Sequence, residues 1–291
     1  MPQHSRRWAL LALIFLSVIW GYNWVVMKAA MSYSPPFTFA TLRTLIGAIP
    51  LLAVLLWQKK PLAPQAPGGL FLVGLFQGAG FAGFSCAALV TGGAGKTALL
   101  AFTMPFWTLL FAWPVLGEKV RGGQWISVGL SLAGMLCVLE PWNLSTPMPA
   151  KLLAIGAGIT WALGAVIAKR LRQQVSIDLI SLTAWQMVFG GLILLAIMLW
   201  ADEGPVHWTP AFAAMLGYNI VLVTAIGWLI WIYILATLPA GTAGLSVLAI
   251  PLIGLLGSRW QLGEGASTAE IVGMVLIFSS LLVLAWRNRK G

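Results

Sequence analysis

The chain has 291 residues, of which 60% are hydrophobic and only 8% are charged, and its formal net charge at pH 7 is +10. The basic residues are spread over separate short segments instead of one patch, which argues against a nucleic-acid partner. No stretch between the apolar runs is long enough to fold as a soluble domain, so nearly the whole mass is predicted to lie in the lipid bilayer.

Continuous apolar stretches follow one another with short gaps, each close to the roughly 20 residues that a helix needs to cross a bilayer. The runs do not alternate in polarity, which favours helices over barrel strands. We therefore predict an all-α membrane protein with ten transmembrane helices. They lie near residues 8–27, 36–57, 69–90, 97–116, 122–139, 152–168, 178–200, 211–235, 241–261 and 268–286.

The charges between these spans predict the orientation of the chain. Arg6 and Arg7 precede the first span, which has no small-residue cleavage site before Lys28 and is expected to remain uncleaved. With the N-terminus inside, twelve of the 17 Lys and Arg residues lie on inner segments and four on outer ones. The positive-inside rule then places both termini in the cytoplasm, in a multi-pass protein of the inner (plasma) membrane.

A motif of fixed spacing occurs once in each half of the chain. The first copy comprises Thr91, Ala94, Gly95, Pro105, Gly117 and Glu118, and the second comprises Thr237, Ala240, Gly241, Pro251, Gly263 and Glu264. Three predicted spans precede the first copy and eight precede the second, so the copies cross the bilayer in opposite directions. We predict two inverted five-helix repeats, residues 1–146 and 147–291, an architecture of secondary transporters.

The sequence also resembles a known family. The residues that carry the resemblance are Trp20-Gly21-x-Asn23 leading to Lys28, then Pro36 and Ala40-x-x-Arg43, followed by the repeated motif. This pattern is similar to that of the drug/metabolite transporter superfamily and its EamA-type ten-helix members. The resemblance covers essentially the whole chain. The second half departs from it, because Trp161-Ala162 replaces Trp-Gly and Ala184 stands about where Arg43 would recur. Within this family, the many Trp residues make the sequence similar to the YddG-like exporters of aromatic and other neutral amino acids. This resemblance implies a cargo of that kind.

Arg43 is the deepest charge of the predicted spans. It is the eighth residue of the second span, roughly 10 Å below the outer edge at about 1.5 Å per residue. Such a charge usually faces a cavity or a partner. It could receive a substrate carboxylate, form a structural ion pair with Glu264, or extend to the interface. Lys28 and Lys96 are weaker carboxylate candidates near the outer surface.

Uncharged amides and aromatic residues within the spans complete the predicted binding site. Gln77 and Asn219 occupy matched positions in the two repeats and are expected to line the cavity, together with Asn23 and Gln186, although each amide could instead tie helices together. The predicted aromatic wall consists of Trp20, Trp107, Trp161, Trp185 and Tyr218. Trp residues at span ends are expected to form interfacial belts.

Two further patterns concern the helices themselves. Pro105 and Pro251 fall near the middle of the fourth and ninth spans, where a proline removes a backbone donor. They are predicted to act as paired hinges, or else as static kinks. Gly74 with Gly78, and Gly129 with Ala133, recur four residues apart and suit close helix packing.

Nothing in the sequence predicts catalysis, a cofactor or a metal site. The run Gly92–Thr97 resembles a phosphate-binding loop, but Val90 stands where that pattern needs its first Gly. No span carries a carboxylate near its centre, which favours facilitated efflux over proton coupling.

The predicted function is therefore export of small metabolites by alternating access around a central cavity, with neutral or aromatic amino acids as the expected cargo. Alternatives are another metabolite or a drug as cargo, and more remotely a channel or a membrane enzyme. The expected partners are a small-molecule substrate and the lipid bilayer, and a monomer suffices.

Overall fold

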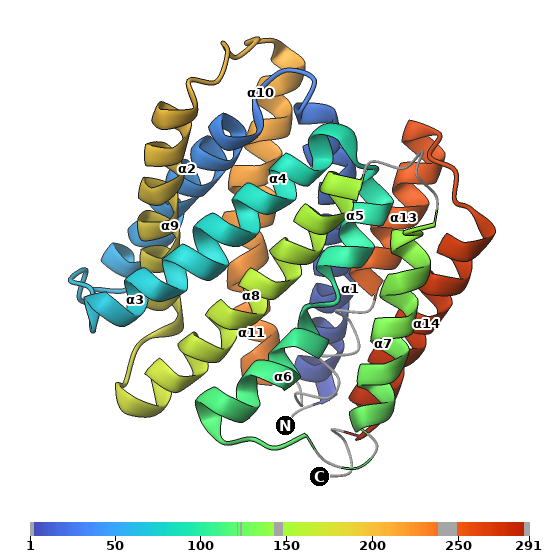
Figure 1. Ribbon diagram of the computed structural model, residues 1–291. Coiled ribbons are helices and arrows are strands. Elements are labelled where there is room, and N and C mark those ends of the chain that lie inside the picture. The colour runs from blue at the N-terminus through green and yellow to red at the C-terminus, as the bar shows by residue number, and fades with distance from the viewer. Residues whose placement is uncertain (1–2, 121, 123, 143–147, 238–248, 288–291) are drawn as a thin grey trace.

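The computed structural model describes residues 3–120, 122, 124–142, 148–237 and 249–287. Within these ranges the chain is helical and has no strands (Figure 1). Part of the second motif copy, including Ala240 and Gly241, lies outside the described residues.

The first half contains five helical segments. They are α1 (Gln3–Ala30), α2 (Pro36–Trp57), the continuous α3–η1–α4 (Pro67–Val73, Gly74–Gly80, Phe81–Thr91), the broken α5 and α6 (Ala94–Ala101 and Met104–Leu116), and α7 (Gln124–Leu139). The second half contains α8 (Met148–Gln174), α9 (Leu179–Ala201), the continuous α10–η2–α11 (Pro210–Gly217, Tyr218–Ile226, Gly227–Thr237), α13 (Ala249–Leu262) and α14 (Thr268–Arg287).

Seven helices among the described residues are long and apolar enough to cross a membrane, and their positions match seven of the predicted spans. They are Trp8–Ala30, Pro36–Trp57, Pro67–Thr91, Ala94–Leu116, Met148–Gln174, Leu179–Ala201 and Pro210–Ile234. Two shorter apolar helices, Gln124–Leu139 and Thr268–Val283, coincide with two more. The predicted span near 241–261 overlaps α13 but begins outside the described residues, so ten crossings stay a prediction.

The helices pack in pairs that join the two halves of the chain. α2 packs against α9, α7 against α14, and α1 against α13 and α11, while α8 contacts α4, α5 and α6. Figure 1 shows α2 and α9 at one side of the bundle and α7 and α14 at the other. α1 and α8 thus each contact helices of the other half of the chain between these two sides.

Small residues let the backbones in this bundle approach closely. A Cβ atom added to Gly190 of α9 would lie 2.8 Å from the Gly74 carbonyl oxygen and 2.8 Å from Gly78 Cα. The prediction that Gly74 and Gly78 serve helix packing is thus confirmed. For Gly129 it is wrong, because a Cβ there would meet nothing within 4 Å on the outer face of α7.

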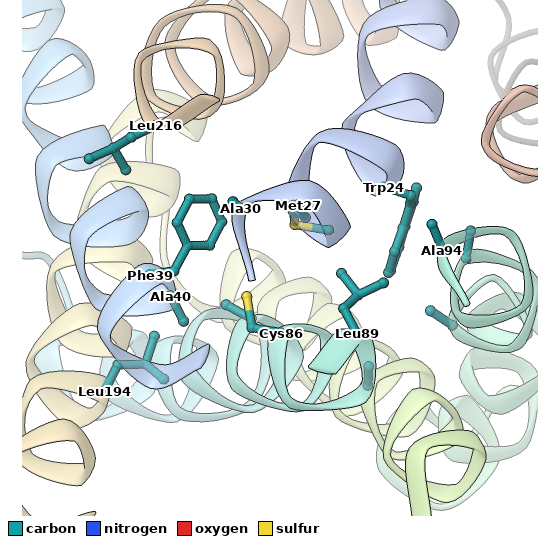
Figure 2. Packing of buried hydrophobic residues seen from close by; sticks show 14 of the residues in the cluster. Trp24, Met27, Ala30, Phe39, Ala40, Cys86, Leu89, Ala94, Leu194 and Leu216 are labelled. Atoms are coloured by element: carbon teal, nitrogen blue, oxygen red, sulfur yellow. The ribbon is translucent and has the colours of Figure 1, made fainter. Parts of the chain in front are cut away.

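The main buried cluster surrounds the second half of α1. Figure 2 shows Trp24 and Met27 of α1 beside Phe39 of α2 and Cys86 and Leu89 of α4. Cys86 and Cys137 are both free thiols. The cluster fixes α1 against α2 and α4, and so positions the α1 residues that face the centre of the bundle.

The two glycines of the repeated Gly-Glu pair stop their helices in the same way. Gly117 after α6 has φ +73° and Gly263 after α13 has φ +66°, both in the left-handed region that glycine adopts without strain. The amide of Glu118 donates to the Ala112 carbonyl at 3.2 Å, and that of Glu264 donates to the Ser258 carbonyl at 3.4 Å. The motif thus ends a helix and directs a glutamate away from it.

Asp178 caps the start of α9, and its removal has a predictable cost. Its carboxylate accepts hydrogen bonds from the backbone N–H groups of Ile180 and Ser181 and from the Lys60 ammonium. Asp178→Ala is expected to destabilise the protein by about 1 kcal/mol, the usual cost of losing an N-cap. Thermal unfolding in detergent measures this, with Gln65→Ala on an exposed loop as the control. Equal melting temperatures for both variants would contradict the capping role.

Candidate functional site

A central cavity of about 460 Å³ lies between helices from both halves of the chain. Its wall is formed by α1, α2, α4, α6, α8, α9, η2, α11 and α13, and most of the lining residues are apolar or aromatic. The volume is in the range of small-molecule sites. The cavity reaches the end of α6, where the side chain of Glu118 is 49% exposed.

Aromatic rings form one continuous part of the wall. Trp161 of α8 stacks on Trp228 of α11 with ring centroids 6.1 Å apart and an interplanar angle of 22°. Trp20 packs edge-on against Trp228 at 5.8 Å, and its indole N–H donates to the Val223 carbonyl at 3.1 Å. These contacts hold the rings in place, so the wall presents flat apolar faces of fixed orientation.

Arg43 contributes the positive charge of the cavity wall. Its guanidinium lies against the sulfur atoms of Met27 and Cys86. None of the ion pairs found among the described residues includes Arg43. The predicted alternative of an ion pair with Glu264 is wrong, because that carboxylate accepts hydrogen bonds from the backbone N–H groups of Ala94 and Gly95. Among the described residues, Arg43 therefore lines the cavity without a carboxylate partner.

Asn23 is a second polar residue of the cavity wall, and its side chain has an unused hydrogen-bond acceptor. Its side chain is only 5% exposed, and Oδ1 has no hydrogen-bond partner in the described part of the chain. A buried acceptor without a partner costs free energy until a donor reaches it. Asn23 and Arg43 both line the cavity, so the site combines an unsatisfied amide with a cation lacking a carboxylate.

Of the predicted site residues, Trp20, Asn23, Arg43, Trp161 and Pro105 line this cavity, and the remaining ones do not. Gln77 lies in η1 against Gly164, where an added Cβ atom would be 2.5 Å from Gln77 Cβ. Gln186 is buried where η1 packs on α9. Asn219 is fully buried in η2 and donates from Nδ2 to the Met215 carbonyl, while its Oδ1 has no partner.

The other predicted aromatic residues have hydrogen-bonding roles elsewhere. The Trp107 indole N–H donates to Thr103 Oγ1 at 3.2 Å, and that of Trp185 donates to the Leu62 carbonyl at 2.9 Å. The Tyr218 hydroxyl donates to the Ile19 carbonyl at 2.8 Å, joining η2 to α1. Sequence reasoning missed Trp24, Phe81, Trp228 and Trp231, which do line the cavity.

The two prolines differ in their surroundings. Pro105 follows a break between α5 and α6 at Phe102 and Thr103, and it lines the cavity in the first turn of α6. Pro251 is buried near the start of α13 and does not line the cavity. The helix is therefore interrupted just before Pro105, whereas hinge motion at either proline stays a prediction.

Charged groups gather at the end of the bundle opposite Glu118. Glu140, Lys151 and Glu270 are each no more than 5% exposed. Lys96 pairs with Glu270 at 2.7 Å, and the Lys151 ammonium donates to the Val138 and Leu139 carbonyls at the end of α7. Across the residues described, no group of three or more His, Cys, Asp or Glu side chains could hold a metal ion.

These features define the class of protein: a polytopic helical membrane protein whose helices enclose a central cavity. A sequence profile described as the EamA-like transporter family matches the chain over residues 7–140 and again over 148–286. The chain therefore belongs to the EamA-like transporter family and is a multi-pass integral membrane transporter, as the resemblance predicted.

Individual relatives agree with this assignment. The chain is 30% identical to the uncharacterized transporter YvbV of Bacillus subtilis strain 168, over 99% of this chain and 95% of that protein. It is 26% identical to the probable amino-acid metabolite efflux pump of Escherichia coli K12, over 98% of each. It is 28% identical to the inner membrane transporter YedA of the same strain, over 94% of this chain and 89% of YedA.

The fold is also shared with a solved structure. One crystal structure superimposes with a TM-score of 0.68 over 97% of this chain and 98% of that chain, at 18% sequence identity. At this identity the likeness concerns the fold alone.

Proposed function

We propose that the chain crosses the membrane ten times as two inverted five-helix repeats, residues 1–146 and 147–291, with both termini in the cytoplasm. The packing partners support this arrangement, because α1 against α13 is matched by α8 against α6, and α9 against η1 by α2 against η2. The two π-helical segments and the two left-handed glycines also occupy matched places. The charge bias of the connecting segments supports the orientation.

The proposed function is export of neutral, especially aromatic, amino acids by alternating access around the central cavity. The observation that carries it is the pairing of Arg43 and Asn23 with an aromatic wall in one cavity. The similarity to a probable amino-acid metabolite efflux pump supports the same cargo class. Inverted repeats can exchange conformations, which is what a carrier needs and a channel does not.

Each part of such a substrate has a complementary group. The guanidinium of Arg43 suits the α-carboxylate, because its paired N–H donors match the two carboxylate oxygens. The unsatisfied Oδ1 of Asn23 accepts a hydrogen bond from the α-ammonium. An aromatic side chain packs on the stacked rings of Trp161 and Trp228.

Other cargoes fit this wall less well. Arg43 is the only Lys or Arg among the described residues that line the cavity, so a phosphorylated metabolite would find a single cation there. A hydrophobic drug would leave Arg43 and Asn23 without partners, at a desolvation cost. Facilitated efflux and function as a monomer complete the proposal, since the cavity is formed within one chain.

Equilibrium binding tests this cargo class. Purified protein in detergent is titrated with L-phenylalanine, with phenylethylamine, which lacks the carboxylate, and with phenylpyruvate, which lacks the ammonium. Quenching of the tryptophan fluorescence reports occupancy, because several Trp rings face the cavity. We expect saturable binding of the amino acid and at least tenfold weaker binding of both analogues. Equal affinity for all three compounds would contradict amino-acid recognition.

A further inference from the structure

Glu264, in the second half of the chain, caps a helix of the first half. Its Oε1 accepts a hydrogen bond from the Ala94 N–H at 2.7 Å, and its Oε2 accepts one from the Gly95 N–H at 3.1 Å. Both donors belong to the first turn of α5, whose N-cap residue Gly93 has no side chain to cap it. A carboxylate 170 residues away in sequence therefore satisfies this helix terminus.

The surrounding residues are small enough to admit this contact. A Cβ atom on Gly93 would lie 2.8 Å from Glu264 Oε2, and one on Gly95 would lie 2.5 Å from Ser258 Oγ. α13 packs against α5 along the same line. Ala94 and Gly95 of one motif copy are thus in direct contact with the glutamate of the other copy.

A second cavity of about 250 Å³ lies behind the contact. It is lined by Gly93, Lys96, Thr97, Lys151 and Glu264, among others, and is more polar in its side chains than the central cavity. The two cavities are near each other along the chain, because Thr97 and Leu100 of α5 line the small one and Phe102, directly after α5, lines the central one.

The matching glutamate at the opposite end is Glu118, and the counterparts of Ala94 and Gly95, which are Ala240 and Gly241, lie outside the described residues. Glu118 lies at the mouth of the central cavity, and its carboxylate pairs with the Lys169 ammonium at 2.6 Å. Both side chains of this pair are about half exposed. Among the described residues, the central cavity thus reaches the half-exposed Glu118, whereas Glu264 is bound to the start of α5.

We infer that Glu264 is the carboxylate that closes one end of the transport path, and that the second cavity is the vestibule through which the central cavity opens when Glu264 releases α5. This inference rests on the proposed alternating access. It assigns to the Gly-Glu pair of the second motif copy a gating role in addition to its role in ending α13. Release is favoured when the carboxylate loses its charge or its length, because charge-assisted hydrogen bonds are about twice as strong as neutral ones.

The test measures access to the central cavity without reference to any substrate. A single reporter cysteine, Thr44→Cys in a Cys86→Ser/Cys137→Ser background, lies in the cavity wall. Spheroplasts expose the Glu264 end under the proposed orientation, and inverted vesicles expose the Glu118 end. A membrane-impermeant thiol reagent is added to each, and the labelling rate is recorded.

We expect the parent to be labelled faster in inverted vesicles than in spheroplasts. Glu264→Gln should raise the rate in spheroplasts about tenfold, which corresponds to about 1.4 kcal/mol. Gly95→Ala, which forces α13 away without changing charge, should raise it in the same direction. If Glu264→Gln does not fold, the labelling rate of Gly95→Ala still tests the gate.

The matched control is Glu203→Gln. Glu203 caps α2 from the end of α9 through the Phe37 and Thr38 N–H groups, at 3.1 and 2.7 Å, and lines neither cavity. Its loss should lower the melting temperature but leave the labelling rate in spheroplasts within about twofold, because neither cavity is affected. Unchanged labelling in folded Glu264→Gln protein, or an equal rise in Glu203→Gln, would overturn the gate. Since labelling needs no cargo, a wrong substrate assignment would not affect this result.

Discussion

Replacing Arg43 by Gln is expected to reduce transport of L-phenylalanine by about a hundredfold or more in kcat/KM. The guanidinium has no carboxylate partner among the described ion pairs, so its charge is available to the substrate. Two charge-assisted hydrogen bonds to a carboxylate in a site shielded from water account for a loss of this size. Arg43→Lys should retain part of the activity, because the ammonium keeps the charge but not the paired donors.

The measurement is initial uptake into proteoliposomes for L-phenylalanine and phenylethylamine with each variant. In the parent the amino acid should be strongly preferred, and in Arg43→Gln the two compounds should be transported at similar low rates. A merely structural Arg43 would instead lower the melting temperature and reduce both rates by the same factor. That outcome would remove Arg43 from the binding site.

The second large effect concerns folding. Gly190→Ala is expected to destabilise the protein by several kcal/mol or to prevent its folding, because the new methyl group would meet three backbone atoms of η1 within 2.9 Å. Backbone atoms cannot turn away as the end of a side chain can. The contact between α9 and η1 would have to separate, and with it the packing of the two halves.

Gly129→Ala is the matched control, since its methyl group would meet nothing within 4 Å. Alanine in the interior of α7 should leave stability unchanged or raise it by about 1 kcal/mol, through its higher helix propensity. Melting temperatures from fluorescence-detected size-exclusion chromatography compare the two variants. Similar stability of both would show that η1 and α9 are not in close contact.

Sequence reasoning located the helices because an apolar run long enough to cross a bilayer leaves the backbone few alternatives to a helix. The spans near 36–57 and 178–200 agree with α2 and α9 to within one residue at each end. The rotation of each helix about its axis was harder to predict. Trp185 donates a hydrogen bond to the Leu62 carbonyl, whereas Trp228 lines the cavity. Both residues have mostly apolar neighbours in the sequence, so the sequence does not distinguish their orientations.

The buried charges illustrate a different limit. Glu270 stands near the start of the predicted span 268–286, and its side chain is only 1% exposed. Ser267 and Glu270 form reciprocal hydrogen bonds at the start of α14, and this S-x-x-E pattern is a signal that the sequence does contain. Its pairing with Lys96 of α5 depends on tertiary packing and leaves no local mark.

The repeated motif was found from the spacing of its residues, and the structure shows what those residues do. Its glycines end α6 and α13, and the Ala-Gly pair of the first copy begins α5. Glu264 of the second copy accepts hydrogen bonds from that Ala-Gly pair and so joins the two halves of the chain. Spacing alone indicated duplication and inversion, but it could not show that one copy binds the other. That contact depends on the approach of α13 to α5.

Counterflow tests the central claim, alternating-access transport of neutral amino acids, most directly. Proteoliposomes are preloaded with unlabelled L-phenylalanine and diluted into a trace of the labelled compound, with empty liposomes and Arg43→Gln as controls. The account predicts a transient accumulation of label above its external concentration, saturable and competed by tryptophan and methionine. Equilibration without overshoot would indicate a channel, and no uptake of any labelled neutral amino acid would contradict the assigned cargo.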